Sequence, residues 1–421
     1  MSSPGANTPF VAIACGGTGG HLFPGLAVAE QLQKRGCAVG LLISPKDVDQ
    51  EAVKSARGME IFKLPAVGLQ NRNYFSFAGS FVKSLFATKK IFRQHRPAVV
   101  LAMGGFTSAP PIWVGKDFGA KTFLHESNTI PGRANRLLAR FVDEAFVGFP
   151  SAATRLRARK VTTTGTPVRP QFRWGEAPDE PDRDGQTMAK TAREDARPTK
   201  TTNSRIALGL EANRPVILVM GGSQGASGLN DLILSALPLL GDRAAAWQWL
   251  HLTGTNDAEK VKAAYDARGF KAVVKPFLAE MDLALGAATV AVSRAGASSL
   301  AEIAAMRLPS LLVPYPAAAD NHQFYNTQAF ETTGAARLLE QKNGTPEKVA
   351  ALMRELVEDA AARAKIQTAL AQWHAPKAAE QIADIMLAAI ARQQEQAAAR
   401  ASKCSCGCAG KSTKQPVSPG A

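Results

Sequence analysis

Cysteine, charge and long apolar runs are scarce in this chain of 421 residues. Only 5 residues are cysteine, too few for the disulfide framework of a small secreted domain. Three of them, Cys404, Cys406 and Cys408, alternate with other residues in a tail, whereas a structural zinc site needs four ligands at wider spacing. Charged residues make up 20% and hydrophobic residues 46%, which excludes a disordered protein.

No apolar run predicts a membrane-spanning helix or a signal peptide. The longest apolar region, near 98–115, is interrupted by Gly104-Gly105 and by Pro110-Pro111, so it is too broken to span a bilayer. The N-terminus has no basic stretch followed by a long apolar one, as a secretory signal would. We therefore expect a cytosolic protein in a reducing compartment.

Acidic residues are scarce only in the first half of the chain. The formal net charge is +15, and residues 1–171 contain 22 basic and 9 acidic side chains. Residues 206–391 contain 16 basic and 18 acidic ones and are nearly neutral. An excess of this kind predicts that one half meets an anionic partner, and nucleic acid, anionic lipid and a phosphorylated substrate all remain open.

Short apolar runs alternate with helical patterns twice along the chain. This alternation predicts two α/β domains with doubly wound parallel sheets, facing each other across a cleft. Residues 174–204 are rich in Pro, Asp, Arg and Thr and have no apolar period, which is typical of a flexible segment. The expected organisation is a first domain at 1–171, a flexible insertion at 172–205, a second domain at 206–375, a helix crossing back at 376–399, and a disordered tail at 400–421.

Each predicted domain opens with a glycine-rich loop between a strand and a helix. The first loop, 15–21, reads CGGTGGH and the second, 221–226, reads GGSQGA. Leu22 stands where a dinucleotide-binding loop needs glycine, and no Gly-Lys-Ser/Thr follows for a P-loop. The second loop also spells the Gly-x-Ser-x-Gly elbow of α/β-hydrolases around Ser223, with His251, His322 and His374 downstream. Phosphate binding by backbone N–H groups accounts for both loops, whereas an elbow accounts for one.

A third glycine-bearing turn, 293–302, precedes a predicted helix and places Glu302 one turn into it. Together these segments resemble the MurG family of UDP-N-acetylglucosamine transferases. The matching stretches follow in order: GGTGGHLFPGLAVAEQL (16–32), MGGFTSAPP (103–111), HESNTIPGRANR (125–136), GTPVR (165–169), GGSQGA (221–226), PFLAEM (276–281), SRAGASSLAEI (293–303) and ADNHQFYN (319–326). The resemblance implies the GT-B fold of two Rossmann-like domains, and a hexosyltransferase that adds N-acetylglucosamine to an undecaprenyl-diphosphate-linked muramyl-pentapeptide.

The resemblance also implies roles for individual residues. His21 would be the catalytic base or a phosphate contact. The acceptor side would include Gly104, Gly105 and Glu126. Gln323 would read the sugar hydroxyls, supported by His322, Asp320 and Asn326. The full set of residues implied to bind UDP-N-acetylglucosamine is Thr18, Gly19, Gly20, Asn128, Arg169, Ser223, Leu278, Ala297, Ser298, Ser299, Leu300, Ala301, Glu302 and Gln323.

The chain departs from the family pattern at three polar positions, and its chemistry needs no cofactor. Ser127 stands where the family often has Gln, Thr166 where Asn is common and Ser299 where Thr is usual. Asp47-Val48-Asp49 and Asp182-Arg183-Asp184 spell the Asp-x-Asp of metal-dependent transferases. Both lie away from the glycine loops, so we expect no metal. Helix N-termini and Ser223 would stabilise the leaving diphosphate, and a single displacement would invert the anomeric carbon.

The segment 73–94 interleaves phenylalanine with lysine and arginine. An apolar patch edged with cations is typical of an interfacial membrane contact, and the alternative is an amphipathic helix packed on the first sheet. We expect Phe75, Phe81, Lys89 and Lys90 to contact an anionic membrane. The family's lipid acceptor implies a peripheral enzyme on the cytoplasmic face of the inner membrane.

Other functions remain open at this point. Within the fold, a different lipid glycosyltransferase, such as a diacylglycerol glycosyltransferase, or a UDP-sugar epimerase is the alternative. A Ser223 hydrolase and a nucleic-acid-binding protein are more distant ones. The aromatics of the basic half are mostly Phe at apolar spacing and no nucleic-acid-binding module is legible, so we expect no nucleic-acid partner.

Overall fold

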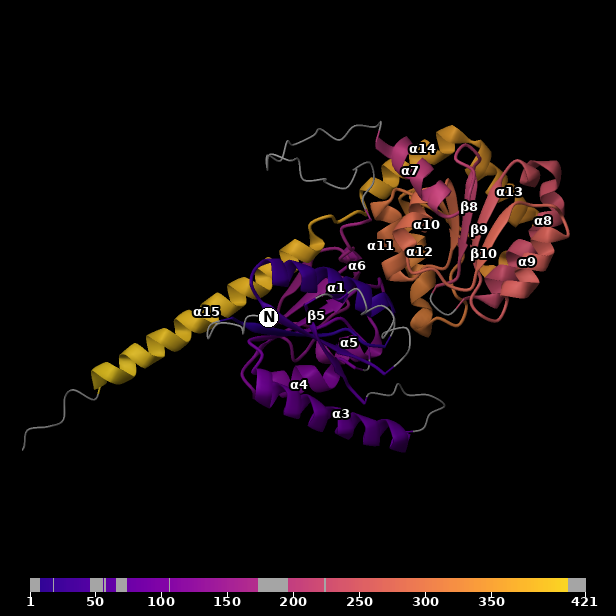
Figure 1. Ribbon diagram of the computed structural model, residues 1–421. Helices are drawn as coiled ribbons and strands as arrows, with labels where there is room; N and C mark the ends of the chain where they lie inside the picture. The colour runs from indigo at the N-terminus through magenta and orange to yellow at the C-terminus, as the bar shows by residue number, and fades with distance from the viewer. Residues whose placement is uncertain are drawn as a thin grey trace, which may run out of the picture.

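A computed structural model describes residues 8–17, 19–45, 56, 58–65, 74–105, 107–172, 196–222 and 225–407. Within these residues the chain forms two α/β domains side by side, with the first domain in indigo and purple and the second in orange (Figure 1). Each domain has one sheet in which every paired strand is parallel to its neighbour. This arrangement confirms the fold class expected from the alternating pattern.

The N-terminal domain has a seven-stranded sheet in the order β3-β2-β1-β4-β5-β6-β7. Its inner strands are apolar because helices cover both faces of the sheet, and all five residues of β1 are buried, whereas the edge strands β3 and β7 have no buried residue. The elements are β1 (Phe10–Ala14), α1 (Gly19–Lys34), β2 (Ala38–Ile43), β3 (Glu60–Lys63), α3 (Tyr74–His95), β4 (Val99–Ala102), α4 (Ala109–Asp117), β5 (Lys121–Glu126), α5 (Arg133–Leu138), β6 (Glu144–Val147), α6 (Pro150–Ala153) and β7 (Val161–Thr163).

The second domain has a six-stranded sheet in the order β10-β9-β8-β11-β12-β13. Its first strand, β8, is again buried at all five positions. The elements are α7 (Ala196–Ala207), β8 (Val216–Met220), α8 (Ser227–Ala245), β9 (Gln248–Leu252), α9 (Ala258–Asp266), β10 (Ala272–Lys275), α10 (Met281–Ala287), β11 (Val290–Ser293), α11 (Ala297–Ala305), β12 (Ser310–Leu312), η2 (Ala319–Asn321), α12 (His322–Thr332), β13 (Arg337–Leu338), η3 (Gln341–Asn343), α13 (Pro346–Glu358), α14 (Ala360–Ala371) and α15 (Ala378–Gly407).

The strand order reverses once in each sheet, and the reversal determines where ligands can bind. In the first sheet it falls between β1 and β4, and in the second between β8 and β11. Ligands of doubly wound proteins bind outside the carboxyl ends of the strands at such switch points. All the glycine-bearing turns singled out in the sequence follow β1, β4, β8 or β11. Each domain therefore presents two of these turns at its switch point.

The second domain begins earlier than the sequence predicted. Helix α7 starts at Ala196, inside the range 172–205 that was expected to be flexible. Arg205 anchors it, because its guanidinium donates to the carbonyls of Ala287 (2.9 Å) and Ala212 (2.6 Å) and to the hydroxyl of Thr289 (3.0 Å). The polar residues at the end of this segment therefore belong to a helix that is anchored to the second domain. Residues 173–195 lie outside the described residues.

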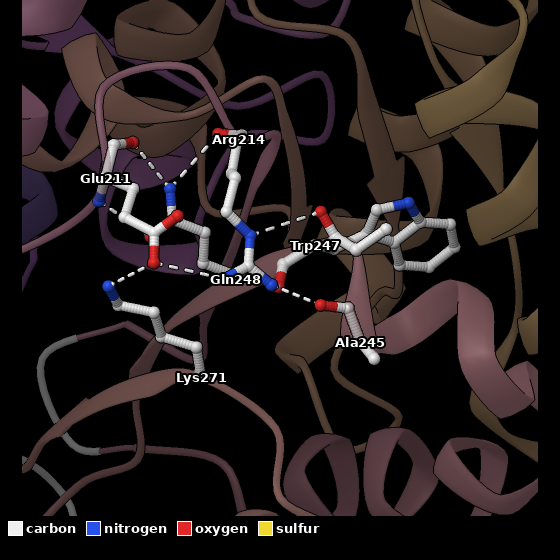
Figure 2. A network of polar contacts seen from close by, with 7 residues as sticks. Glu211, Arg214, Ala245, Trp247, Gln248 and Lys271 are labelled. Carbon is white, nitrogen blue, oxygen red and sulfur yellow. Dashed lines mark hydrogen bonds and ion pairs between the residues drawn. The ribbon is translucent and has the colours of Figure 1, made fainter.

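A buried amide fixes the connection from α7 to β8 (Figure 2). The side chain of Gln248, which is fully buried, accepts from the backbone N–H of Glu211 (2.8 Å) and donates to the carbonyls of Glu211 (2.7 Å) and Arg214 (3.1 Å). Arg214 donates to the carbonyl of Trp247 (3.2 Å), and Lys271 pairs with the Glu211 carboxylate (2.6 Å). These contacts hold the first strand of the domain against β9 and β10.

The last helix leaves the second domain and packs on the first. Ala379, Ile382, Ala383 and Met386 of α15 are buried in the core that α1 and β1 form in the N-terminal domain. The helix continues to Gly407, eight residues beyond the expected end at 399, and its second half extends past the domain (Figure 1). Across the described part of the chain, no helix combines the length and hydropathy needed to cross a membrane.

Candidate functional site

A cavity of about 760 Å³ lies between the two domains at the switch points of both sheets. Its N-terminal wall comes from the first turn of α1 and the loops that follow β4 and β5. Its C-terminal wall comes from the loops after β8 and β10 and from the start of α11 and α12. Of the residues expected to bind substrate, those lining it are Gly19, Gly20, His21, Gly105, Glu126, Asn128, Arg169, Leu278, Ala297, Ser298, Ser299, Glu302 and Gln323.

Some expected residues lie elsewhere or outside the described residues. Leu300 is fully buried in the hydrophobic core of the second domain and its N–H bonds the carbonyl of Gly296 within the helix, so it offers no group to a ligand. Ala301 likewise is not among the lining residues. Neither residue lines the cavity, and their part in binding stays a prediction. Thr18 and Ser223 lie outside the described residues, as do Asp47, Asp49, Asp182 and Asp184.

The first glycine loop is shaped by close backbone contacts. Gly17 has a φ of 115°, which favours glycine. A Cβ on Gly16 would lie 2.2 Å from the backbone N of Ser44, so any side chain there would force β1 and β2 apart. The loop consequently brings the N-terminus of α1, with its partial positive charge, to the cavity.

His21 lies in the first turn of α1 and packs on the glycine turn after β4. Gly104 and Gly105 have φ values of 109° and 80°. A Cβ on Gly104 would lie 3.1 Å from Nε2 of His21, and one on Gly105 would lie 3.3 Å from Nδ1. The hydroxyl of Thr107 donates to the carbonyl of Gly16 (2.8 Å), which ties this turn to the first glycine loop. The imidazole is thus held at the cavity by backbone on one side.

Glu126 ends β5 and organises the loop that follows it. Its carboxylate is buried and accepts four hydrogen bonds, from the N–H of Asn128 (2.8 Å), the amide of Asn128 (3.0 Å), the N–H of Gly132 (2.9 Å) and the amide of Asn135 (2.8 Å). All four donors are neutral. The carboxylate therefore fixes the loop after β5 on the N-terminal wall by hydrogen bonds.

Asn326 of α12 joins the two domains through hydrogen bonds beside the cavity residue Asn128. Its buried amide donates to the side-chain oxygen of Asn128 (3.0 Å) and to the carbonyl of Ala295 (3.2 Å). Its oxygen accepts from the N–H and the hydroxyl of Thr129 (2.9 Å each). The four hydrogen bonds use the full capacity of the amide, so Asn326 positions Asn128 and does not face a ligand. A further cross-domain bond runs from the hydroxyl of Ser298 to the carbonyl of Gly20 (2.9 Å).

His125, one residue before Glu126, is buried and neutral. Burial lowers its pKa to about 4. Its ring contacts the carbonyl of Gly165 through Nε2 (3.1 Å) and the hydroxyl of Ser127 through Nδ1 (3.2 Å). The carbonyl can only accept, so Nε2 carries the proton and Nδ1 accepts from Ser127. Ser127, where the family often has Gln, thus has a structural partner.

On the C-terminal wall, Glu302 lies in α11 and is 9% exposed. Burial raises its pKa to about 7, the charge of Arg169 opposes that rise, and Asp282 adds to it. The guanidinium of Arg169 lies between two rings, 4.3 Å from the centroid of Phe23 and 5.1 Å from that of Phe172. Phe23 belongs to α1, whereas Phe172 packs in the core of the second domain. The contact with Phe23 has no local signature in the sequence, because Phe23 and Arg169 are far apart along the chain.

Gln323 has one end of its amide fixed by the second domain. Its oxygen accepts from the N–H of Ala295 (3.1 Å) and from the N–H of Tyr315 (2.9 Å). The NH₂ end is therefore left to donate toward the cavity that Gln323 lines. A donor group beside a sugar-sized space suits the recognition of hydroxyl or carbonyl oxygens.

Helix α3 contains the expected membrane residues and lies on the outer side of the first domain (Figure 1). Phe81 is half-buried and its ring packs against Trp113 of α4, with centroids 5.4 Å apart. Phe86 is instead 71% exposed, and Lys89 and Lys90 are exposed beside it in the sequence. The side chain of Phe75 lies outside the described residues.

The hydrolase alternative has no support from the histidine on β9. His251 is buried, and burial lowers its pKa to about 3. Its two ring nitrogens contact the hydroxyl of Tyr265 (3.1 Å) and the side-chain oxygen of Asn230 (3.0 Å). Both nitrogens are thus occupied in the core of the second domain.

Comparison with known proteins agrees with this geometry. Residues 11–147 match the N-terminal domain of glycosyltransferase family 28, and residues 216–382 match its C-terminal domain. A protein of Anaeromyxobacter sp. (strain Fw109-5), named UDP-N-acetylglucosamine--N-acetylmuramyl-(pentapeptide) pyrophosphoryl-undecaprenol N-acetylglucosamine transferase, is 35% identical over 386 residues, which cover 90% of this chain and 93% of the relative.

Solved structures share the arrangement of both domains. Acinetobacter baumannii MurG is similar with a TM-score of 0.65 at 25% identity, over 90% of this chain and 99% of that one. A UDP-GlcNAc 2-epimerase from Neisseria meningitidis, bound to UDP-GlcNAc, shares the fold with a TM-score of 0.63 at 13% identity, over 90% of this chain and 99% of that one. The expected GT-B fold is confirmed.

Proposed function

This chain belongs to glycosyltransferase family 28, and we propose that it transfers N-acetylglucosamine from UDP-N-acetylglucosamine to the muramyl sugar of an undecaprenyl-diphosphate-linked muramyl-pentapeptide. This reaction converts lipid I to lipid II in peptidoglycan synthesis. Membership follows from the two domain matches and from relatives that share about a third of their residues over nearly the whole chain. The function carried by the relatives' names fits a cavity with one polar wall from each domain.

The observation that supports the proposal is the position of His21 on the N-terminal wall of a cavity whose other wall comes from the second domain. The imidazole rests on the Gly104–Gly105 turn, and the first turn of α11 contributes to the opposite wall. A histidine has an ordinary pKa near 6.5 and suits the removal of a proton from an acceptor hydroxyl near neutral pH. His21 would take that proton as the hydroxyl attacks the anomeric carbon. UDP would leave from the opposite face, so the product would be inverted.

The leaving diphosphate would be stabilised by backbone groups. The N-termini of α1 and α11 meet at the cavity, where Gly20 and Ser298 are joined by a hydrogen bond. Each helix N-terminus contributes on the order of 1 kcal/mol to binding negative charge, and more in a site that excludes water. These two helix N-termini would neutralise the developing charge without a metal ion. Ser223 would add a hydroxyl to the same region.

Four side chains that line the cavity would recognise the donor: Glu302, Gln323, Leu278 and Arg169. The Glu302 carboxylate would accept from the ribose hydroxyls, and the fixed amide of Gln323 would donate to the sugar. Arg169 and Leu278 would flank the uracil, because both line the cavity beside Glu302. Gly105, Glu126 and Asn128 lie on the N-terminal wall, where the acceptor would bind. We therefore call the N-terminal wall the acceptor wall and the C-terminal wall the donor wall.

The acceptor is a membrane lipid, so the N-terminal domain would face the bilayer. Helix α3 supports this orientation because Phe86 and the lysines at 89 and 90 are exposed. The protein would then act as a peripheral enzyme on the cytoplasmic face of the inner membrane. We extend the expected contact of Phe75, Phe81, Lys89 and Lys90 to Phe86, since Phe81 is partly used in packing against Trp113.

The proposal is tested by transfer from labelled UDP-N-acetylglucosamine to lipid I, with UDP release measured alongside. We expect label in the lipid fraction and UDP in equal amounts, and neither product without the acceptor. A 2-epimerase would instead convert UDP-N-acetylglucosamine to its 2-epimer without acceptor. Transfer to diacylglycerol but not to lipid I would identify a different lipid glycosyltransferase and reject the proposal.

A further inference from the structure

Two arginines of the acceptor wall are paired across the cavity with one aspartate of the donor wall. Arg136, in the middle of α5, contacts the carboxylate of Asp320 at 2.6 Å, and Arg133, the first residue of the same helix, contacts it at 3.4 Å. The arginine side chains are 45% and 84% exposed, and that of Asp320 is 29% exposed. Arg133 and Asp320 both line the cavity. The pairs therefore lie at the mouth of the site and are open to solvent.

This arrangement is a poor device for holding the domains together. Exposed ion pairs contribute little to stability, because solvent screens them and both side chains lose rotamer freedom. Asp320 and Asn321 also have φ values of 49° and 54°, and consecutive non-glycine residues in the left-handed region cost free energy. Asn326 of α12 already joins the second domain to the loop before α5 with buried hydrogen bonds. Holding the two domains together therefore does not explain the ion pairs.

The arginines lie beside the groups that would handle the acceptor. Asn135, between them in α5, has its amide 3.0 Å from the position of a Cβ on Gly104, the turn on which His21 packs. The same amide donates to the Glu126 carboxylate. An acceptor hydroxyl delivered to His21 would place the acidic groups of the acceptor along this wall.

We propose that Arg133 and Arg136 form an anion-binding site for the acidic groups of the acceptor, and that Asp320 occupies this site while the acceptor is absent. The inference rests on the proposed function. Guanidinium groups bind phosphate and carboxylate oxygens with two parallel hydrogen bonds. The Asp320 carboxylate is the intramolecular equivalent of such a ligand. The incoming anion would displace Asp320, so the arginines would exchange one anionic partner for another.

The test uses two substitutions that break the same ion pair with opposite predicted effects. Arg136→Gln removes a cation from the site, so KM for lipid I should rise roughly tenfold, as expected for a hydrogen bond to a charged group. Asp320→Asn removes the competitor, so KM for lipid I should fall about threefold, given the small contribution of exposed pairs. Asparagine also tolerates the left-handed backbone at 320. UDP affinity, measured by calorimetry, reports whether the donor wall is intact in each variant.

Arg243→Gln is the matched control, because it breaks an exposed pair with Glu358 on helices α8 and α13, away from the cavity. It should leave KM unchanged. If Arg136→Gln and Asp320→Asn both raise KM for lipid I, the pair is a closure contact and the inference is wrong. If the wild-type protein transfers no sugar to lipid I, the proposed function fails, and the inference falls with it for a distinguishable reason.

Two inhibitors distinguish the source of the anion. A short-chain polyprenyl diphosphate supplies the diphosphate alone, and a water-soluble muramyl-pentapeptide supplies the carboxylates alone. Arg136→Gln should weaken inhibition by whichever compound carries the group that the arginines bind, and Arg133→Gln should weaken the same one. Unchanged inhibition by both compounds would overturn the inference.

Discussion

The two walls of the cavity each contain a buried carboxylate, and the two differ in how many hydrogen bonds they accept. Glu126 on the acceptor wall accepts four hydrogen bonds from neutral donors. Glu302 on the donor wall has no comparable set among the described residues, and burial raises its pKa to about 7. A saturated carboxylate holds its surroundings in one shape. An unsaturated one has acceptor capacity left for a ligand.

The same contrast holds for charge on the scale of the domains. The acceptor-side half contains 22 basic and 9 acidic residues, whereas residues 206–391 contain 16 and 18. The N-terminal domain can thus attract an anionic surface and an anionic acceptor over a distance. The second domain would bind its nucleotide with backbone N–H groups and a few side chains. Net charge therefore indicates the partner of one domain only.

The largest expected effect is on the acceptor wall, at His21. His21→Ala should lower kcat at least about 100-fold, the low end of general-base effects, while UDP affinity stays nearly unchanged. His21→Gln retains a hydrogen-bonding group but cannot act as a base, so it should be nearly as slow. Steady-state kinetics with lipid I and calorimetry with UDP measure both quantities. A Gln variant close to the wild type would reduce His21 to a phosphate contact.

The next prediction concerns the outer face of the same domain. Replacing Lys89 and Lys90 with Gln should weaken binding to anionic vesicles about 30-fold, since each cation near such a surface contributes roughly 1 kcal/mol. Lys348→Gln with Lys365→Gln removes equal charge from the second domain and should have little effect. Sedimentation with phosphatidylglycerol vesicles measures both. Equal losses in the two double variants would mean that net charge alone drives binding, and the contrast between the domains would disappear.

A third prediction tests the contact that joins the walls. Asn326→Ala leaves the Asn128 side-chain oxygen and the N–H of Thr129 without their partner. An unsatisfied buried group costs about 1–3 kcal/mol, so kcat should fall on the order of tenfold and the melting temperature should drop. Asn326→Asp still accepts from Thr129 but cannot donate to Asn128. Its carboxylate would face the oxygens of Asn128 and Ala295 inside the protein, and a buried charge without a partner is costly. It should therefore be no more stable than the Ala variant and should be slow, and a fast Asp variant would contradict the positioning role.

The sequence predicted the parts of this site that depend on local pattern. Buried strands appear as apolar runs, and turns at strand ends appear as glycines, so the positions of the loops containing Gly17, Gly225 and Gly296 followed from the sequence pattern. The cross-domain pairs did not, because Asn128 and Asn326 are 198 positions apart and either amide alone is an ordinary polar residue. Only the fold brings them together.

Helix faces were the second limit. Phe77, Phe81 and Phe86 all fit an amphipathic pattern, and only packing against Trp113 shows that Phe81 is turned toward α4 while Phe86 is exposed. The early start of α7 was missed for a similar reason. Its anchor, Arg205, contacts Ala287 and Thr289, and a polar segment that is stabilised by distant partners has no local signature.

The smallest expected effect concerns the donor wall and the carboxylate with which the comparison began. The pKa of Glu302 is raised to about 7, so the side chain is half protonated at neutral pH in the empty protein. Ribose hydroxyls donate more strongly to a charged carboxylate than to a neutral carboxyl group. UDP affinity should therefore fall as the pH falls through 7, by up to about tenfold between pH 8 and pH 6, because the ionised fraction falls by that factor. Glu302→Gln should bind UDP more weakly at pH 8 and lose this dependence, as calorimetry at three pH values would show.

Glu126→Gln should bind UDP with the wild-type pH dependence, since that carboxylate faces the acceptor loop. If the pH dependence is lost in Glu126→Gln and retained in Glu302→Gln, Glu302 is not the carboxylate that controls UDP binding.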